Sequence, residues 1–307
     1  MIRRDFLQRM ASGGMLLSAG KFPMHALGNS ALPPEIKKIT ILHTNDVHSR
    51  IDPFPMDGGR NEGRGGVVRR GALIDSIRRE GNPVLLLDAG DFFQGTPYFN
   101  LFGGEIELKA MSALGYDAAT IGNHDFDGGI DGLANQMHNA NFPLISSNYD
   151  FSDTVLHDKV KPFKVFTFEE IKVGVFGLGI ELRGLVPQTL YKATRYLDPV
   201  KHAADTAKFL RKEMGCQYVV CMSHLGFKYQ EEKISDVSLA SLTNDIDLII
   251  GGHTHTFLRD AELVPNQDKS QVVVNQVGWG GIRLGRIDVF FEKNRPGRCE
   301  ACQNLKV

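Results

Sequence analysis

The sequence lacks several features that mark particular classes of protein. No apolar run approaches the ~20 residues needed to cross a bilayer, and there is no internal repeat, heptad run or low-complexity tract. A net charge of −1 gives no electrostatic reason to expect nucleic acid or an anionic membrane surface as a partner. The 307 residues, 42% of them hydrophobic, are enough to bury a core in one large domain or two modest ones.

Cysteine is also scarce, with four residues in the chain. Cys299 and Cys302 have the spacing of a zinc-binding pair, but one pair supplies only half of a four-cysteine site. In an oxidising compartment the same pair could form a disulfide instead. Cys216 and Cys221 flank a predicted strand, where a free cysteine behaves as a small hydrophobic residue. We therefore assign no function to the cysteines.

The N-terminal segment has the pattern of an export signal. The sequence RRDFL at residues 3–7 precedes a weakly apolar stretch at residues 10–20, and Ala26-Leu27-Gly28 is a small-x-small cleavage site. This pattern resembles a twin-arginine signal. We expect residues 1–28 to direct the protein to the periplasm and residues 29–307 to form a single domain. The alternative is an amphipathic N-terminal helix on a cytoplasmic protein.

Five apolar segments are predicted to be buried β-strands, and each leads into a polar loop. They are residues 39–42, 84–87, 118–121, 218–222 and 248–250. A helix is predicted over residues 198–215, with an Asp N-cap, Pro at the first helical position and a terminal Gly. Residues 163–180 and 271–291 are predicted to be antiparallel hairpins, which indicates an α/β fold with mixed sheets. Loops at the carboxyl ends of such strands can converge on one site.

These five loops carry the side chains of a metal site. The candidate ligands are Asp46, His48, Asp91, Asn123, His224, His253 and His255. Taken singly, most would be read as helix caps, turn residues or ordinary histidines, but six of the ten histidines fall at these strand ends. Carboxylate, imidazole and amide oxygen suit Zn, Mn or Fe. Seven ligands fill two four-coordinate sites if one carboxylate bridges, and Asp91 is the expected bridge between two divalent ions about 3.5–4 Å apart.

The loop motifs resemble those of the calcineurin-like metallophosphoesterases. The matching blocks are Asp46-x-His48, Gly90-Asp91, Gly122-Asn123-His124-Asp125, Ser223-His224 and Gly251-Gly252-His253-Thr254-His255. Longer matches, such as GDFFQGTP at residues 90–97 and NHDFD at residues 123–127, are similar to the 5′-nucleotidase branch. The resemblance implies a four-layer αββα fold, in which two mixed sheets form a sandwich flanked by helices. Residues 29–307 would then be one catalytic domain.

The resemblance also implies a role for each candidate residue. One ion would be held by Asp46, His48, Asp91 and His255, and the other by Asp91, Asn123, His224 and His253. Asn123 and His124 would contact the phosphate. His124 would act as general acid or stabilise developing charge, and Asp127 would orient the imidazole and favour its charged form. The implied reaction is an in-line attack of activated water on phosphorus, without a covalent enzyme intermediate.

The substrate and partners remain open. Full-length 5′-nucleotidases resemble this chain only in their first half, and their second domain supplies phosphate-binding arginines and an aromatic clamp for the base. We expect a small phosphorylated substrate, a nucleotide first, with a separately encoded C-terminal domain protein as the partner. The alternatives are a broad phosphatase or phosphodiesterase acting on nucleotide-sugars or cyclic nucleotides, and a non-enzymatic metal-bearing half of a two-chain assembly. A thiosulfate-releasing hydrolase branch ranks lower.

The export signal can be tested by a conservative double substitution. Arg3→Lys with Arg4→Lys keeps the charge but removes the twin arginines, so we expect the uncleaved protein to stay in the cytoplasm. Fractionation of cells that produce each form would measure this. Unchanged export of the double variant would contradict the prediction.

Overall fold

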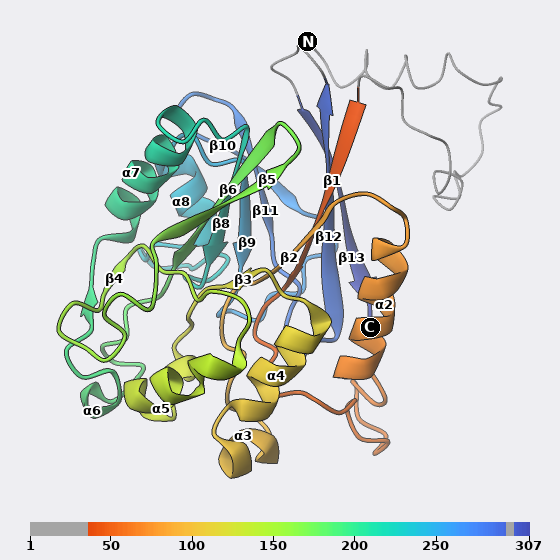
Figure 1. Ribbon diagram of the computed structural model, residues 1–307, viewed down its shortest axis with the longest axis vertical. Helices are drawn as coiled ribbons and strands as arrows, with labels where there is room; N and C mark the ends of the chain where they lie inside the picture. The colour runs from red at the N-terminus through yellow and green to blue at the C-terminus, as the bar shows by residue number, and fades with distance from the viewer. Residues whose placement is uncertain (1–35, 293–297) are drawn as a thin grey trace.

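The computed structural model describes residues 36–292 and 298–307. The expected signal segment, residues 1–28, lies outside these ranges, so it stays a prediction. Figure 1 shows two β-sheets side by side, with helices on their outer sides. Within the described ranges, no helix has both the length and the apolar character of a membrane span.

The first sheet has five strands in the order β13-β12-β1-β2-β3. Their bounds are β1 (Ile36–Thr44), β2 (Val84–Asp88), β3 (Ala118–Ala119), β12 (Arg283–Glu292) and β13 (Arg298–Lys306). Strands β1, β2 and β3 run parallel, whereas β12 is antiparallel to both β1 and β13. The sheet is therefore mixed, and its parallel strands deliver three of the predicted site loops to one edge.

The second sheet has six strands in the order β10-β11-β9-β8-β6-β5. Their bounds are β5 (Phe163–Phe168), β6 (Ile171–Leu178), β8 (Tyr218–Ser223), β9 (Leu248–Gly251), β10 (Glu262–Pro265) and β11 (Gln271–Asn275). The four inner strands are parallel, and β5 and β10 are antiparallel edges. This sheet delivers the His224 loop and the His253–His255 loop.

The two sheets pack face to face through alternating side chains. In β2, Leu85 and Leu87 point between the sheets, whereas Leu86 belongs to the cluster on the outer face. The inner cluster joins these leucines to Val220 and Ile250 of the second sheet. Because both faces of each sheet are covered, the inner strands read as continuous apolar runs.

Helices cover the two outer faces, which gives the four-layer αββα architecture that the resemblance implies. The first sheet packs against α2 (Val67–Arg78) and α4 (Glu105–Leu114), and the second against α7 (Pro199–Lys212) and α8 (Asp236–Leu242). Figure 1 shows α7 and α8 on the opposite side of the molecule from α2. The remaining elements are α3 (Pro97–Phe102), η2 (His124–Phe126), α5 (Gly129–Gln136), η3 (Met137–Asn139), β4 (Tyr149–Asp150), α6 (Gln188–Tyr191) and β7 (Arg195–Tyr196).

Most of the predicted elements are present. Helix α7 begins at Pro199, and the Asp198 carboxylate caps it by accepting hydrogen bonds from the backbone N–H groups of Val200 and Lys201. The predicted hairpin at residues 163–180 is confirmed by the antiparallel pair β5 and β6. The strand predicted over residues 118–121 is shorter, because regular pairing stops at Ala119.

The predicted hairpin at residues 271–291 is wrong. Strand β11 lies in the second sheet and pairs with β9 and β10, whereas β12 lies in the first sheet beside β1. The connection has three glycines with positive φ: Gly278 (82°), Gly280 (63°) and Gly281 (61°). These left-handed positions let the chain cross between the sheets, and the crossing loop carries Trp279 past the strand ends.

The packing of β6 can be tested at Gly177. A Cβ there would overlap the Ile145 carbonyl oxygen and the Thr120 hydroxyl. We expect Gly177→Ala to lower the free energy of unfolding by about 1–3 kcal/mol, as measured by urea denaturation. The matched control is Gly132→Ala in α5, where no atom lies within 4 Å of a new Cβ. It should be neutral or stabilising by up to about 1 kcal/mol. Equal stabilities for the two variants would contradict this account.

Candidate metal centre

The candidate ligands lie on loops whose backbone is held in an uncommon conformation. Five of the seven have positive φ: Asp46 (49°), His48 (50°), Asp91 (57°), His253 (71°) and His255 (52°). A residue other than glycine costs about 1–3 kcal/mol in this region, and such residues cluster at functional sites. The surrounding hydrogen bonds hold these loops in place and so determine where the ligands point.

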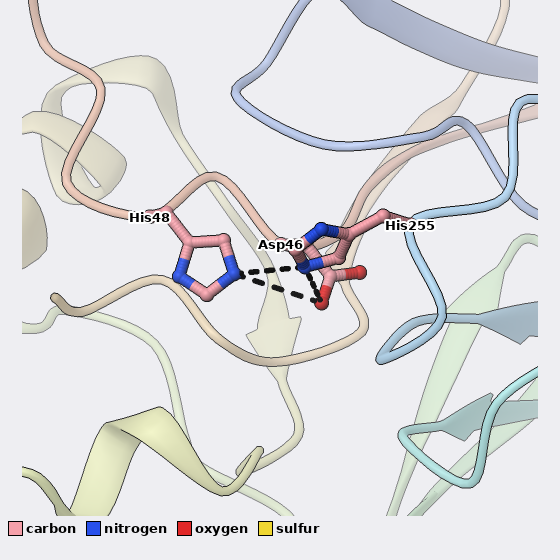
Figure 2. Close-up of side chains that lie close together, drawn as sticks. All are labelled: Asp46, His48 and His255. Atoms are coloured by element: carbon pink, nitrogen blue, oxygen red, sulfur yellow. Dashed lines mark hydrogen bonds and ion pairs between the residues drawn. The ribbon is translucent and has the colours of Figure 1, made fainter. Parts of the chain in front are cut away.

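The first cluster consists of Asp46, His48 and His255, which come from the ends of β1 and β9. The His255 Nε2 atom lies 3.3 Å from Asp46 Oδ1 and 3.0 Å from His48 Nε2, and His48 Nε2 is 4.0 Å from the same carboxylate oxygen. Figure 2 shows the two imidazoles converging on the Asp46 carboxylate. Asp46 is fully buried, and His255 is exposed on the open side.

The second cluster consists of Asp91, His224 and His253. The His224 Nε2 atom lies 3.0 Å from Asp91 Oδ2. Asn123 joins this cluster, because its Oδ1 atom is 2.9 Å from His253 Nδ1. The structure therefore brings all seven candidate residues together in two adjoining groups. Their assignment as ligands of two ions stays a prediction.

The two clusters meet at the buried carboxylates. The Asp91 Oδ2 atom lies 4.0 Å from His48 Nε2 of the first cluster as well as 3.0 Å from His224 of its own. Asp46 Oδ1 likewise lies 4.0 Å from His224 Nε2. Either carboxylate is close to both groups. Asp91 is the shorter link to His224, and its bridging role stays a prediction.

The orientation of the His224 imidazole shows that the residues of the second cluster fit a divalent ion. Its Nδ1 atom lies 2.7 Å from the Ala89 carbonyl oxygen, so the opposite atom, Nε2, faces the cluster. That Nε2 atom is buried and has no hydrogen-bond partner of acceptable geometry, although Asp91 is adjacent. A buried imidazole nitrogen beside a carboxylate, with no well-aligned hydrogen bond joining them, fits the donor set of a divalent cation.

The charges of the site point the same way. Burial alone would lower the pKa of His224, but the Asp91 and Asp46 carboxylates raise that pKa to about 10. Burial would raise the pKa of Asp91, yet His224 and His48 bring it below its usual range. The buried carboxylates thus require a positive charge, which a proton or a metal ion can supply. Burial lowers the pKa of His253 to about 4, so that imidazole is neutral and free to ligate.

Asn45 and Asp125 support the ligands without joining them. The Asn45 side chain donates to Asp46 Oδ2 at 2.6 Å and accepts from the backbone N–H of Val277 at 3.0 Å. The Asp125 carboxylate accepts from the backbone N–H groups of Asp91, Phe92, Phe93 and Gly122 at 2.8–3.1 Å. Asn45 was not among the predicted site residues, although it sits directly before Asp46 in the first motif.

His124 and Asp127 form a pair beside the clusters. The His124 Nδ1 atom lies 2.8 Å from Asp127 Oδ2, and this hydrogen bond raises the pKa of His124. The His124 backbone N–H donates to Asp91 Oδ1 at 2.8 Å, which ties the pair to the second cluster. The ring centroid of His124 is 5.2 Å from that of His48. His124 is therefore near both groups. Asp127 binds the Nδ1 atom of His124 and leaves its Nε2 atom without this partner.

An open cavity of about 310 Å³ lies in front of the first cluster. It is lined by His48, Arg50, Gln94, Gly95, His124, His255 and Trp279. Arg50 and Trp279 were not predicted as site residues. Arg50 had a local signal, since it lies two residues after His48, whereas nothing in the sequence around Trp279 indicates where the crossing loop passes.

Comparisons with known proteins identify the family of this chain. Residues 39–257 match the family described as calcineurin-like phosphoesterase. The snake venom 5′-nucleotidase of Gloydius brevicauda is 33% identical over 277 residues, 83% of this chain and 45% of that protein. The trifunctional nucleotide phosphoesterase YfkN of Bacillus subtilis is 33% identical over 287 residues, covering 83% of this chain and 18% of that protein.

A solved structure gives the same match. The 5′-nucleotidase precursor of Thermus thermophilus superposes with a TM-score of 0.77 at 31% sequence identity. The superposition covers 88% of this chain and 54% of the Thermus protein. The chain thus spans about half the length of most curated relatives that it matches, and less of YfkN.

Because Asp91 lies close to both clusters, we expect a substitution of Asp91 to weaken metal binding at both. We expect the purified protein to hold two divalent ions and Asp91→Asn to weaken both sites by more than the ~10–100-fold typical of outer-shell changes. Elemental analysis after dialysis would measure this. The control is Asp75→Asn on α2, whose side chain is 64% exposed, and it should leave the metal content unchanged. One ion or fewer in fully active protein, or full occupancy in Asp91→Asn, would contradict the two-ion site.

Proposed function

We propose, on the premise that this chain belongs to the 5′-nucleotidase branch of the calcineurin-like phosphoesterase family, that it is a two-metal phosphomonoesterase acting on nucleotides. The observation that carries this is the His124–Asp127 pair on the rim of two adjoining clusters of metal-ligand type. A site that only bound metal would not need an imidazole that is paired with a carboxylate and lines the open cavity.

The metal-ligand clusters account for the activation of phosphorus. Two divalent ions bound there would neutralise charge on the phosphoryl oxygens and lower the pKa of the attacking water. The chain's own part is to hold the substrate in line. The Asn123 Oδ1 atom lies 2.9 Å from His253 Nδ1 of the second cluster. In this proposal, the Asn123 amide would contact an ion with one atom and a phosphoryl oxygen with the other.

His124 would then protonate the departing oxygen. Its Nδ1 atom is engaged by Asp127, which leaves Nε2 as the atom that faces substrate. The carboxylate favours the imidazolium form, because it raises the pKa of His124. Asp127 acts through His124 as a positioning residue.

A second candidate is a broader phosphoesterase that also cleaves nucleotide-sugars or cyclic nucleotides. The open cavity and the relative named as a trifunctional nucleotide phosphoesterase favour it. Both candidates use the same metal centre and the same imidazole. They differ in whether a second ester group on phosphorus is accepted. Export and a separately encoded C-terminal domain partner stay predictions.

The test is a set of substrates offered to metal-loaded protein and to His124→Asn. We expect nucleoside 5′-monophosphates to be cleaved faster than cyclic nucleotides and nucleotide-sugars. His124→Asn should keep both ions yet lower kcat by roughly 10²–10⁴-fold. The loss should be smallest for nitrophenyl phosphate, because its leaving group needs no proton. Asp127→Asn should give a milder form of the same pattern. Asn123→Ala should weaken one metal site and slow all substrates alike.

The matched control is His157→Asn. His157 also pairs with an aspartate, Asp158, at 3.1 Å, but it is 57% exposed and does not line the cavity. It should behave as the parent protein. The proposal fails if protein carrying both ions hydrolyses no phosphate ester. The role of His124 fails if its variant loses metal or slows good and poor leaving groups equally.

A further inference from the structure

Four side chains beside the first cluster contact one another in succession, and three of them line the cavity. The Trp279 indole lies almost parallel to the His255 imidazole, with ring centroids 5.8 Å apart and planes at 14°. Phe54 meets Trp279 edge to face at 5.3 Å and 86°. The Arg50 guanidinium carbon lies 4.1 Å from the centre of the Phe54 ring. Arg50, Trp279 and His255 all line the cavity.

The loop that carries Trp279 is held by hydrogen bonds to Asn45 and Asp46 of the first cluster's loop. The Gly280 backbone N–H donates to the Asp46 carbonyl oxygen at 2.7 Å, and the Gly278 carbonyl accepts from Asn45 Nδ2 at 2.6 Å. A Cβ at Gly278 would overlap the Phe257 ring. Trp279 therefore stands between two glycines that are held against the loop of a metal ligand. Its position is rigid before any substrate arrives, which lowers the entropic cost of stacking on it.

Arg50 lacks an anionic partner. Its Nε atom is buried without a hydrogen bond. Among the described side chains, those of residues 36–292 and 301–307, no carboxylate forms an ion pair with its guanidinium within 4.0 Å. Burial lowers the pKa of Arg50, and the Asp52 carboxylate opposes that shift only through space, since it forms no ion pair with Arg50. That carboxylate accepts a hydrogen bond from the Tyr98 hydroxyl at 2.8 Å. Arg50 is half-buried on the cavity wall, so its guanidinium has N–H groups free to bind an anion that enters the cavity.

We propose that Arg50 and Trp279 form a substrate-holding subsite supplied by this domain. The Arg50 guanidinium binds a non-bridging phosphoryl oxygen, and the Trp279 indole stacks on the base of a nucleoside phosphate. A guanidinium offers paired N–H groups that match phosphate oxygens. A cavity of about 310 Å³ is at the lower end of the volumes that hold small organic ligands. This inference rests on the proposed function.

Stacking can be measured without catalysis, because Trp279 is the only tryptophan in the chain. Its fluorescence, excited where tyrosine does not absorb, reports on this wall alone. We expect adenosine, which has no phosphate to hydrolyse, to change the fluorescence of metal-loaded protein with saturation, and ribose to have no effect. No saturable change with adenosine would overturn the stacking role, whether or not the protein hydrolyses phosphate esters.

Kinetics separate the two residues. Trp279→Leu should lower kcat/KM for adenosine 5′-monophosphate by roughly 5- to 100-fold, the range expected for one stacked base, with little change for ribose 5-phosphate, which lacks a base. Trp279→Phe should retain most of the preference. Equal losses on the two substrates would overturn the role of Trp279 while leaving the phosphoesterase proposal intact.

Arg50 has its own readout, which is inhibition by inorganic phosphate. Arg50→Gln should weaken that inhibition by roughly 10- to 100-fold, as for a hydrogen bond to a charged group, and raise KM for both sugar and nucleoside phosphates. Arg50→Lys should restore part of the loss. The control is Arg259→Gln, since Arg259 is 96% exposed and outside the cavity. The metal content and the thermal unfolding midpoint of all three variants should match those of the parent protein. Unchanged phosphate inhibition in folded, metal-loaded Arg50→Gln would overturn this role.

Discussion

Two buried carboxylates organise the site, because each one binds the backbone of a loop from elsewhere in the chain. Asp46, after β1, accepts from the His253 backbone N–H with both oxygens at 3.0 Å, which joins the two sheets. Asp91, after β2, accepts from the His124 backbone N–H. Asp125 in turn holds the Asp91 loop through backbone N–H groups. Hydrogen bonds of this kind to a charged acceptor contribute about 1.5–3 kcal/mol each, enough to hold loops whose ligands sit in left-handed backbone. Two of the candidate ligands, Asp46 and Asp91, therefore also position the loops that carry the others.

This arrangement explains why the site needs both sheets. The first cluster combines β1 with β9, and the second combines β2, the η2 segment, β8 and β9. Neither sheet alone supplies a complete set of ligands for either ion. Packing between the sheets, through side chains such as Leu87 and Ile250, sets the distance between the ligand loops. Substitutions in that core should thus affect metal affinity as well as stability, since interiors transmit strain rather than absorb it.

The sequence identifies the local parts of this site and misses the non-local ones. The seven candidate ligands follow strands within motifs of a few residues, so apolar runs and residue type were enough to predict that they lie together. The hairpin predicted at residues 271–291 failed, because two apolar segments joined by a short loop read alike whether they pair or cross between sheets. Locally, the crossing differs from a hairpin in the positive φ of Gly278, Gly280 and Gly281, and the sequence does not reveal those backbone angles. Trp279 was missed for the same reason, since its place beside His255 depends on that crossing and not on its neighbours in sequence.

The division between predictable and missed residues also separates two functions of the site. In the proposed function, the candidate metal ligands would activate phosphorus in any ester, and their geometry depends on backbone hydrogen bonds at the strand ends. In the proposed subsite, Arg50 and Trp279 of the cavity wall would contact the rest of the substrate, with Phe54 packed against both. Their placement depends on where two longer loops pass. Loops of this kind can change with little effect on the sheets that carry the ligands. Discrimination among phosphate esters would then arise from a few side chains on this wall, at a metal centre that does not itself distinguish them.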